Sequence, residues 1–142
     1  MKRALVLARK AQGLGEVPVG ALVVRDGRVI GSGQNETVSS HDPSAHAEII
    51  ALRNAGRAAG NYRLPGCWLY VTLEPCCMCA GAIIHARLEG VVYAASDPKT
   101  GADGGRFDLL RSGHHNHRVE VVHGVLAKES SELLKGFFRQ RR

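Results

Sequence analysis

The chain has 142 residues, a hydrophobic content of 44%, a charged content of 23% and a formal net charge of +6. This length and composition predict one globular domain spanning residues 1–142, and they exclude a disordered, collagen-like or repeat-array chain. The apolar runs are shorter than the roughly 20 residues of a membrane-spanning helix, and the positive charge favours a polyanionic partner such as RNA or DNA.

The first third of the chain predicts a helix followed by a β-hairpin. The apolar residues of Lys2–Gln12 form one stripe, which is typical of a packed surface helix. Val17–Arg25 and Arg28–Gly33 are the two expected strands, because the Asp-Gly pair between them is a two-residue hairpin signal.

Two further helices are expected in the middle of the chain. Asp42-Pro43 predicts a helix start, with the aspartate as N-cap, and Ala45–Ala59 continues that helix. Cys67–Leu73 is a short apolar strand, and Pro75 begins a second helix directly after it.

The last third predicts the strands Gly90–Ala95 and Val119–Val122 and a closing helix, Lys128–Arg139. Ser96–Gly105 is a polar, glycine-rich loop, and a short helix is expected between it and the last strand. Strands separated by helices require crossover connections. The order therefore predicts an α/β fold, a three-layer α/β/α sandwich with a mixed sheet of about five strands.

The four cysteines crowd into one short segment, as Cys67, Cys76, Cys77 and Cys79. Cysteines this close in sequence cannot form disulfide bonds that link distant parts of the chain, so we expect a reducing, cytoplasmic location. Cys76 and Cys79 are three residues apart, and on a helix their thiols share a face and can chelate one ion, whereas Cys77 points elsewhere.

His46 and Glu48 complete this chemistry. Two thiolates and one neutral imidazole are three ligands for a tetrahedral zinc, and an open fourth position is typical of catalysis. Bound zinc makes a water molecule reactive near neutral pH, and Glu48 is the candidate to move protons between water, substrate and departing ammonia. Because residues two apart on a regular helix face different directions, the sequence leaves open how His46 and Glu48 meet.

A structural zinc site with four ligands, using Cys67 or Cys77 as the fourth, is the alternative, and it leaves Glu48 without a role. The arrangement His-x-Glu followed by Pro-Cys-x-x-Cys matches the signature of zinc deaminases, in which the glutamate is not a ligand. The sequence therefore favours a zinc-dependent hydrolytic deaminase of a nucleobase, with one zinc ion per subunit.

Over nearly its whole length the chain resembles the bacterial tRNA-specific adenosine deaminases. The matching segments include EVPVGALVV, RVIGSGQN, HDPSAHAEIIALR, LYVTLEPCCMCAGAIIHARL and DPKTGADGG. The resemblance implies a cytidine-deaminase-like fold, conversion of the wobble adenosine of an arginine tRNA to inosine, and a homodimer whose active site is completed across the interface. The chain departs from the family in a first helix that starts later than usual and in Cys77, where valine is usual.

By position, the resemblance makes His46, Cys76 and Cys79 the zinc ligands and Glu48 the proton shuttle. It also gives Asn35 a contact with the target nucleoside, with a plain loop residue as the alternative. Asp97 would lie in the loop that holds the anticodon backbone, or would simply start the turn at the following proline. Phosphate contacts are expected from Lys99 and from other basic residues, namely Arg106, Lys135, Arg139, Arg141 and Arg142.

Two other functions stay open at this point. A zinc deaminase of a free base, nucleoside or nucleotide shares the metal motif, but the basic charge and the DPKTGADGG segment favour RNA. A non-catalytic, zinc-bearing RNA-binding module has no need of Glu48. The histidines 114, 115 and 117 receive no role, and at least one of Phe137 and Phe138 is expected to pack in the core.

Overall fold

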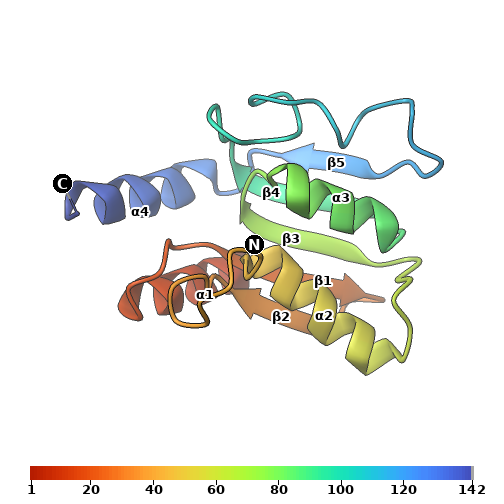
Figure 1. The fold of residues 1–142 in the computed structure, drawn as a ribbon, viewed down its shortest axis with the longest axis horizontal. Helices are drawn as coiled ribbons and strands as arrows, with labels where there is room; N and C mark the ends of the chain where they lie inside the picture. The colour runs from red at the N-terminus through yellow and green to blue at the C-terminus, as the bar shows by residue number, and fades with distance from the viewer. Residues whose placement is uncertain (142) are drawn as a thin grey trace.

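The computed structural model describes residues 1–141, so Arg142, one of the residues expected to contact phosphate, lies outside the described part. Four helices and five strands alternate along this part of the chain (Figure 1). In chain order they are α1 (Lys2–Gly13), β1 (Gly20–Arg25), β2 (Arg28–Gln34), α2 (Ala47–Ala59), β3 (Trp68–Leu73), α3 (Cys77–His85), β4 (Gly90–Ala95), β5 (Glu120–His123) and α4 (Ala127–Arg139).

The five strands form one mixed sheet in the order β2-β1-β3-β4-β5. β1 runs antiparallel to both β2 and β3, whereas β3, β4 and β5 are parallel to one another. Asp26 and Gly27, which join β1 to β2, have φ values of 51° and 73°, the positive angles that a tight hairpin turn requires. The predicted hairpin and mixed sheet of about five strands are confirmed.

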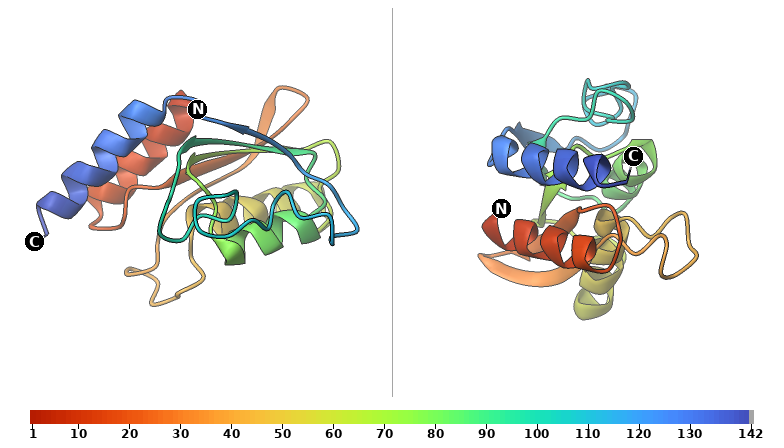
Figure 2. Two further views of the ribbon diagram at one scale, coloured as in Figure 1. Left: turned by 90° about the horizontal axis from the view of Figure 1, so that it is seen from above. Right: turned by 90° about the vertical axis from the view of Figure 1, so that its left-hand side faces the viewer.

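Helices cover both faces of the sheet. α1 and α4 lie side by side on one face, and α2 and α3 lie on the other (Figure 2). The buried side chains of the strands and helices form a hydrophobic core that includes Val23, Val71, Val91, Ala51 and Ile83. The structure is therefore the expected three-layer α/β/α sandwich.

Two glycines of β2 let α2 approach the sheet closely. A Cβ on Gly31 would collide with the carbonyl oxygen of Ala51, and one on Gly33 would collide with that of Ala47. Since neither strand residue has a side chain, the helix backbone rests directly on the strand. This contact fixes the beginning of α2, next to His46, against the sheet.

The start of α2 was predicted wrongly. Asp42 does not cap the helix, because its Oδ1 accepts from Ser44 N at 2.8 Å and from Ser44 Oγ at 2.7 Å, which closes a local turn. The helix begins at Ala47, with His46 as its N-cap. Similarly, α3 begins at Cys77 rather than at Pro75.

The short helix expected before β5 is also absent from the described residues, where 106–118 form turns, bends and an isolated bridge from Asp108 to Asp103. Contacts to distant residues hold this segment instead. Arg111 pairs with Asp103 at 2.7 Å, and His117 Nε2 donates to the carbonyl of Leu88 at 2.7 Å.

In α4, the prediction that at least one of Phe137 and Phe138 packs in the core is confirmed, because Phe137 is buried while Phe138 is half exposed.

In the part of the chain that the structure covers, no helix is long and apolar enough to cross a membrane.

Candidate active site

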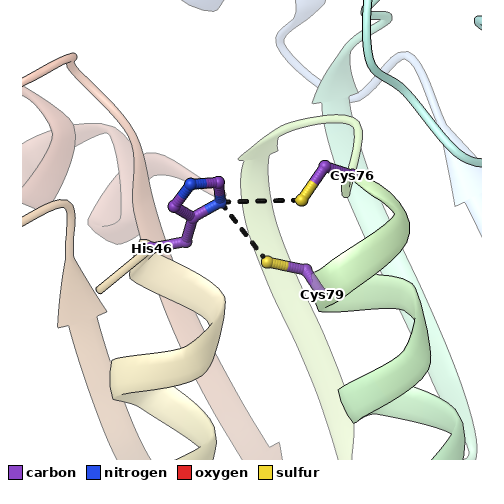
Figure 3. A group of neighbouring side chains, drawn as sticks. All are labelled: His46, Cys76 and Cys79. Carbon is purple, nitrogen blue, oxygen red and sulfur yellow. Dashed lines mark hydrogen bonds between the residues drawn. The ribbon is translucent and has the colours of Figure 1, made fainter. Parts of the chain in front are cut away.

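Three potential metal ligands converge where α2 and α3 begin (Figure 3). His46 is the N-cap of α2, with φ −73° and ψ 153°, and Cys76 is the N-cap of α3, with φ −76° and ψ 174°. Cys79 lies in the first turn of α3 and is buried. Both helices thus direct their N-termini, which carry a partial positive charge, toward the same point.

The spacing of the three ligand atoms suits a tetrahedral zinc ion. His46 Nδ1 lies 3.6 Å from Cys76 Sγ and 3.6 Å from Cys79 Sγ, and the three atoms lie within 4.8 Å of one another. Bond lengths of about 2.3 Å to sulfur and about 2.0 Å to nitrogen, at a tetrahedral angle, separate such ligands by about 3.6 Å. The donor set of two sulfurs and one imidazole is also one that zinc prefers.

The other candidate ligands do not join this group within the residues described. Cys67 is fully buried in the core, where its Sγ lies 3.8 Å from the carbonyl of Pro65. Cys77 packs against the core from the first position of α3. The group therefore offers three candidate ligands rather than the four of a structural zinc site.

Hydrogen bonding among the ligands shifts their ionisation. The Cys79 thiol hydrogen-bonds to Cys76 and lowers the pKa of Cys76 to about 4, although burial opposes this effect. The same bond is the main reason that the pKa of Cys79 is raised. Hydrogen bonding to Cys76 also raises the pKa of His46, against the effect of burial. A cation bound by all three must therefore displace protons from this site.

Glu48 lies in the first turn of α2 and is only 4% exposed. Burial raises the pKa of its carboxyl to about 7, and hydrogen bonding to its own backbone and the charge of His46 partly offset this shift. Because His46 has an extended backbone outside the helix, the helical rule that separates residues two apart does not apply to this pair. The carboxyl hydrogen-bonds to Cys79 and so lies beside the ligand group, of which it is not a member.

Asn35 is buried immediately after β2 and caps α2 from a distance. Its Oδ1 accepts from the backbone N–H of Ala47, the first residue of the helix, at 2.9 Å. This bond orients the amide so that its Nδ2 can still serve as a donor. The sequence did not predict this capping contact, because the two residues are twelve positions apart.

Asp97 and Lys99 lie in the loop that follows β4. The Asp97 carboxylate accepts from the backbone N–H groups of Lys99 at 2.9 Å and Thr100 at 3.2 Å, and from the Thr100 hydroxyl. This pattern is the turn that the sequence offered as the alternative role for Asp97. The side chain of Lys99 is exposed.

Arg141, one of the residues expected to contact phosphate, is engaged within the chain. Its Nη2 donates to the carbonyl of Gly15 at 2.7 Å, and its guanidinium lies 4.3 Å from the centre of the Phe137 ring. These contacts join the end of α4 to the segment after α1.

Two buried carboxylates, Glu16 and Glu74, hold loops in place and were not predicted from the sequence. Glu16 accepts from Ser39 N at 2.7 Å, Val38 N at 3.1 Å and Thr37 Oγ1 at 3.2 Å. Burial acts to raise the pKa of Glu16, but these hydrogen bonds outweigh it and leave the pKa lowered. No local pattern reveals such a residue, because its partners are mostly backbone groups far along the chain.

Comparisons with known proteins agree with this arrangement. The sequence profile of the MafB19-like deaminases matches residues 1–142. A tRNA-specific adenosine deaminase of Haemophilus influenzae is 55% identical over 143 residues, covering 100% of this chain and 83% of the relative. The tRNA-specific adenosine deaminase of Bacillus subtilis is 46% identical, with coverage of 100% and 88%.

Solved structures show the same fold. One, from studies of A-to-I editing by tRNA:A34 deaminases at the wobble position of transfer RNA, matches with a TM-score of 0.91 and 47% identity, covering 94% of this chain and 97% of the other. A guanine deaminase from Nitrosomonas europaea matches with a TM-score of 0.84 and 26% identity, covering 96% and 81%.

Proposed function

Because this chain belongs to the MafB19-like deaminases and to the tRNA-specific adenosine deaminases, we propose that it converts the wobble adenosine of an arginine tRNA to inosine. Hydrolytic deamination of tRNA adenosine is the activity of its family. The observation that supports this chemistry is that His46, Cys76 and Cys79 converge as potential metal ligands, with the buried carboxyl of Glu48 beside them.

We propose that His46, Cys76 and Cys79 hold one zinc ion per subunit. The 3.6 Å separations from imidazole nitrogen to each sulfur and the converging helix N-termini support this assignment. Zinc, when bound, supplies a Lewis acid that makes a water molecule nucleophilic near neutral pH.

Glu48 is the proposed proton shuttle. Its carboxylate takes one proton from the attacking water and passes it to the ring nitrogen next to the reacting carbon. It then takes the remaining proton from the hydroxyl group added to that carbon and passes it to the departing amino group. Water thus supplies the oxygen of inosine, and ammonia leaves with the displaced nitrogen. The carboxyl is buried and hydrogen-bonds to Cys79, which supports a role at the reacting atoms rather than in solvent.

The substrate contacts are proposed for Asn35, Asp97 and Lys99. Asn35 presents an amide whose oxygen is already occupied by Ala47 N–H, so its Nδ2 is the atom available to donate to the nucleoside. The exposed Lys99 pairs with a phosphate. Asp97 positions its loop through the local turn, and any ribose contact from its carboxylate is additional to those bonds.

The same resemblance leads us to propose a homodimer and a cytoplasmic location, where tRNA is found. Sedimentation equilibrium at micromolar concentration tests the dimer directly. A monomer under these conditions contradicts it.

The test of function is inosine formation by the purified zinc-loaded protein. An arginine tRNA anticodon stem-loop is compared with a stem-loop that carries adenosine at the wobble position in another sequence context, and with free adenosine, cytidine, cytosine and guanine. Inosine in the arginine stem-loop alone supports the full proposal. Equal conversion of both stem-loops removes the arginine specificity, and ammonia release only from a free base or nucleoside identifies a metabolic deaminase instead.

A further inference from the structure

Glu74 connects the sheet to the proposed metal site. It follows the last residue of β3 and precedes Pro75 and Cys76, and its side chain is 2% exposed. Its backbone N–H donates to the carbonyl of Ala95, at the end of β4, at 2.8 Å. The residue is thus fixed by its own main chain before its carboxyl makes any contact.

Three backbone N–H groups of one loop converge on this carboxyl. Oε2 accepts from Asp97 at 2.8 Å, and Oε1 accepts from Asp103 at 2.8 Å and Gly105 at 3.0 Å. Hydrogen bonds to an ionised carboxylate are stronger than those between neutral groups. A single side chain therefore anchors the 97–105 loop at three of its residues.

The same loop also contacts the ligand segment directly. Ala102 N donates to the carbonyl of Pro75 at 2.8 Å, and Gly101 forms an isolated antiparallel bridge with Cys76. The loop backbone packs tightly against the Glu74 side chain, because a Cβ on either Gly101 or Gly105 would collide with the Glu74 carboxyl. The loop and the ligand segment consequently form one rigid unit with Glu74 between them.

We propose that Glu74 is a positioning residue for RNA binding: it holds the 97–105 loop at a fixed place beside Cys76, so that the outward side chains of the loop meet the substrate. This inference rests on the proposed function, which supplies the RNA. The role is distinct from catalysis, since every bond of the carboxylate described above is made to the protein backbone.

Glu74→Gln tests the proposal with little change in side-chain size. Glutamine replaces one acceptor oxygen by an NH₂ group, which must face a backbone N–H donor and cannot accept from it. Amide hydrogen exchange at Asp97, Asp103 and Gly105 is expected to accelerate at least about tenfold. The KM for the stem-loop is expected to rise about tenfold, while kcat per bound zinc changes less than about threefold.

Ser130→Ala is the matched control. Ser130 is buried in α4, on the opposite face of the sheet from α2 and α3, and its hydroxyl donates to the carbonyl of Thr72. Loss of this bond lowers stability without touching the loop, so neither the three exchange rates nor KM is expected to change.

Two results overturn the proposal: wild-type exchange and KM in Glu74→Gln, or loss of activity only in proportion to the zinc-loaded fraction. If Glu74→Gln does not fold, Gly105→Ala disturbs the contact between the loop and the Glu74 carboxyl from the loop side. An unchanged KM in Gly105→Ala also overturns the proposal. If the wild-type protein forms no inosine, the proposed function fails, and the exchange rates still decide whether Glu74 holds the loop.

Discussion

Asn35 allows structural and substrate roles to be separated with two substitutions. In Asn35→Ala the backbone N–H of Ala47 loses its partner, and water cannot replace it because Ala47 is 0% exposed. A buried donor left unpaired costs about 1–3 kcal/mol. At about 3 °C per kcal/mol for a domain of this size, Tm should fall by about 3–9 °C.

In Asn35→Asp the acceptor oxygen remains, and a carboxylate at a helix N-terminus is electrostatically favourable. This variant should therefore lose less stability than Asn35→Ala. Its side chain has no amide N–H, so the proposed bond to the nucleoside is lost. We expect kcat/KM to fall about 10- to 100-fold, which corresponds to one hydrogen bond.

The assay pairs thermal unfolding at a fixed zinc concentration with inosine formation from the stem-loop, because bound metal contributes to Tm. If Asn35→Ala unfolds at the wild-type temperature, the Asn35 side chain contributes nothing to capping α2. If Asn35→Asp deaminates at the wild-type rate, the Asn35 amide makes no hydrogen bond to the nucleoside.

Further predictions concern the metal, the proton shuttle, the RNA contact and acid stability. Glu48→Gln should lower turnover by about 10²- to 10⁴-fold, with zinc per chain, measured by elemental analysis, unchanged; brisk deamination contradicts the assigned role. Cys76→Ser should lose zinc and melt at a lower temperature, as the wild type should after chelation, and a fully loaded variant argues against this ligand. Lys99→Ala should raise KM and flatten its dependence on salt concentration, whereas an unchanged salt slope excludes a phosphate contact. Because the folded pKa of Glu16 is lowered, its contribution to stability is fully present above the unfolded pKa of about 4.3 and is lost as pH falls from there through the lower folded pKa. Glu16→Gln should therefore show a shallower acid denaturation curve in circular dichroism.

The order of helices and strands was predictable because each has a local signal. The Asp-Gly hairpin, the apolar strand before Pro75 and the stripe of the first helix all reflect the chain's immediate neighbours. Helix starts were less predictable. Asp42-Pro43 has the composition of a start, yet α2 begins at Ala47, where the capping oxygen comes from Asn35 in a different element.

The ligand types and their spacing could be read from the sequence, and the structure brings His46, Cys76 and Cys79 together. How the side chains of His46 and Glu48 meet could not be read from the sequence, because it depends on the extended backbone of His46 at the N-cap of α2. The buried carboxylates Glu16 and Glu74 also escaped notice, since their hydrogen bonds are made mostly to backbone groups that no residue pattern specifies.

The anchoring of the 97–105 loop through main-chain N–H groups has a consequence for how this protein can change. Every residue type except proline offers such a donor, so the outward side chains of the loop are not constrained by the anchor. If the loop meets RNA as proposed, substitutions at the exposed positions between Asp97 and Gly101 should leave the proposed zinc ligands in place while altering which nucleic acid is accepted. A library randomised at these positions is therefore the economical route to a variant with a new substrate preference.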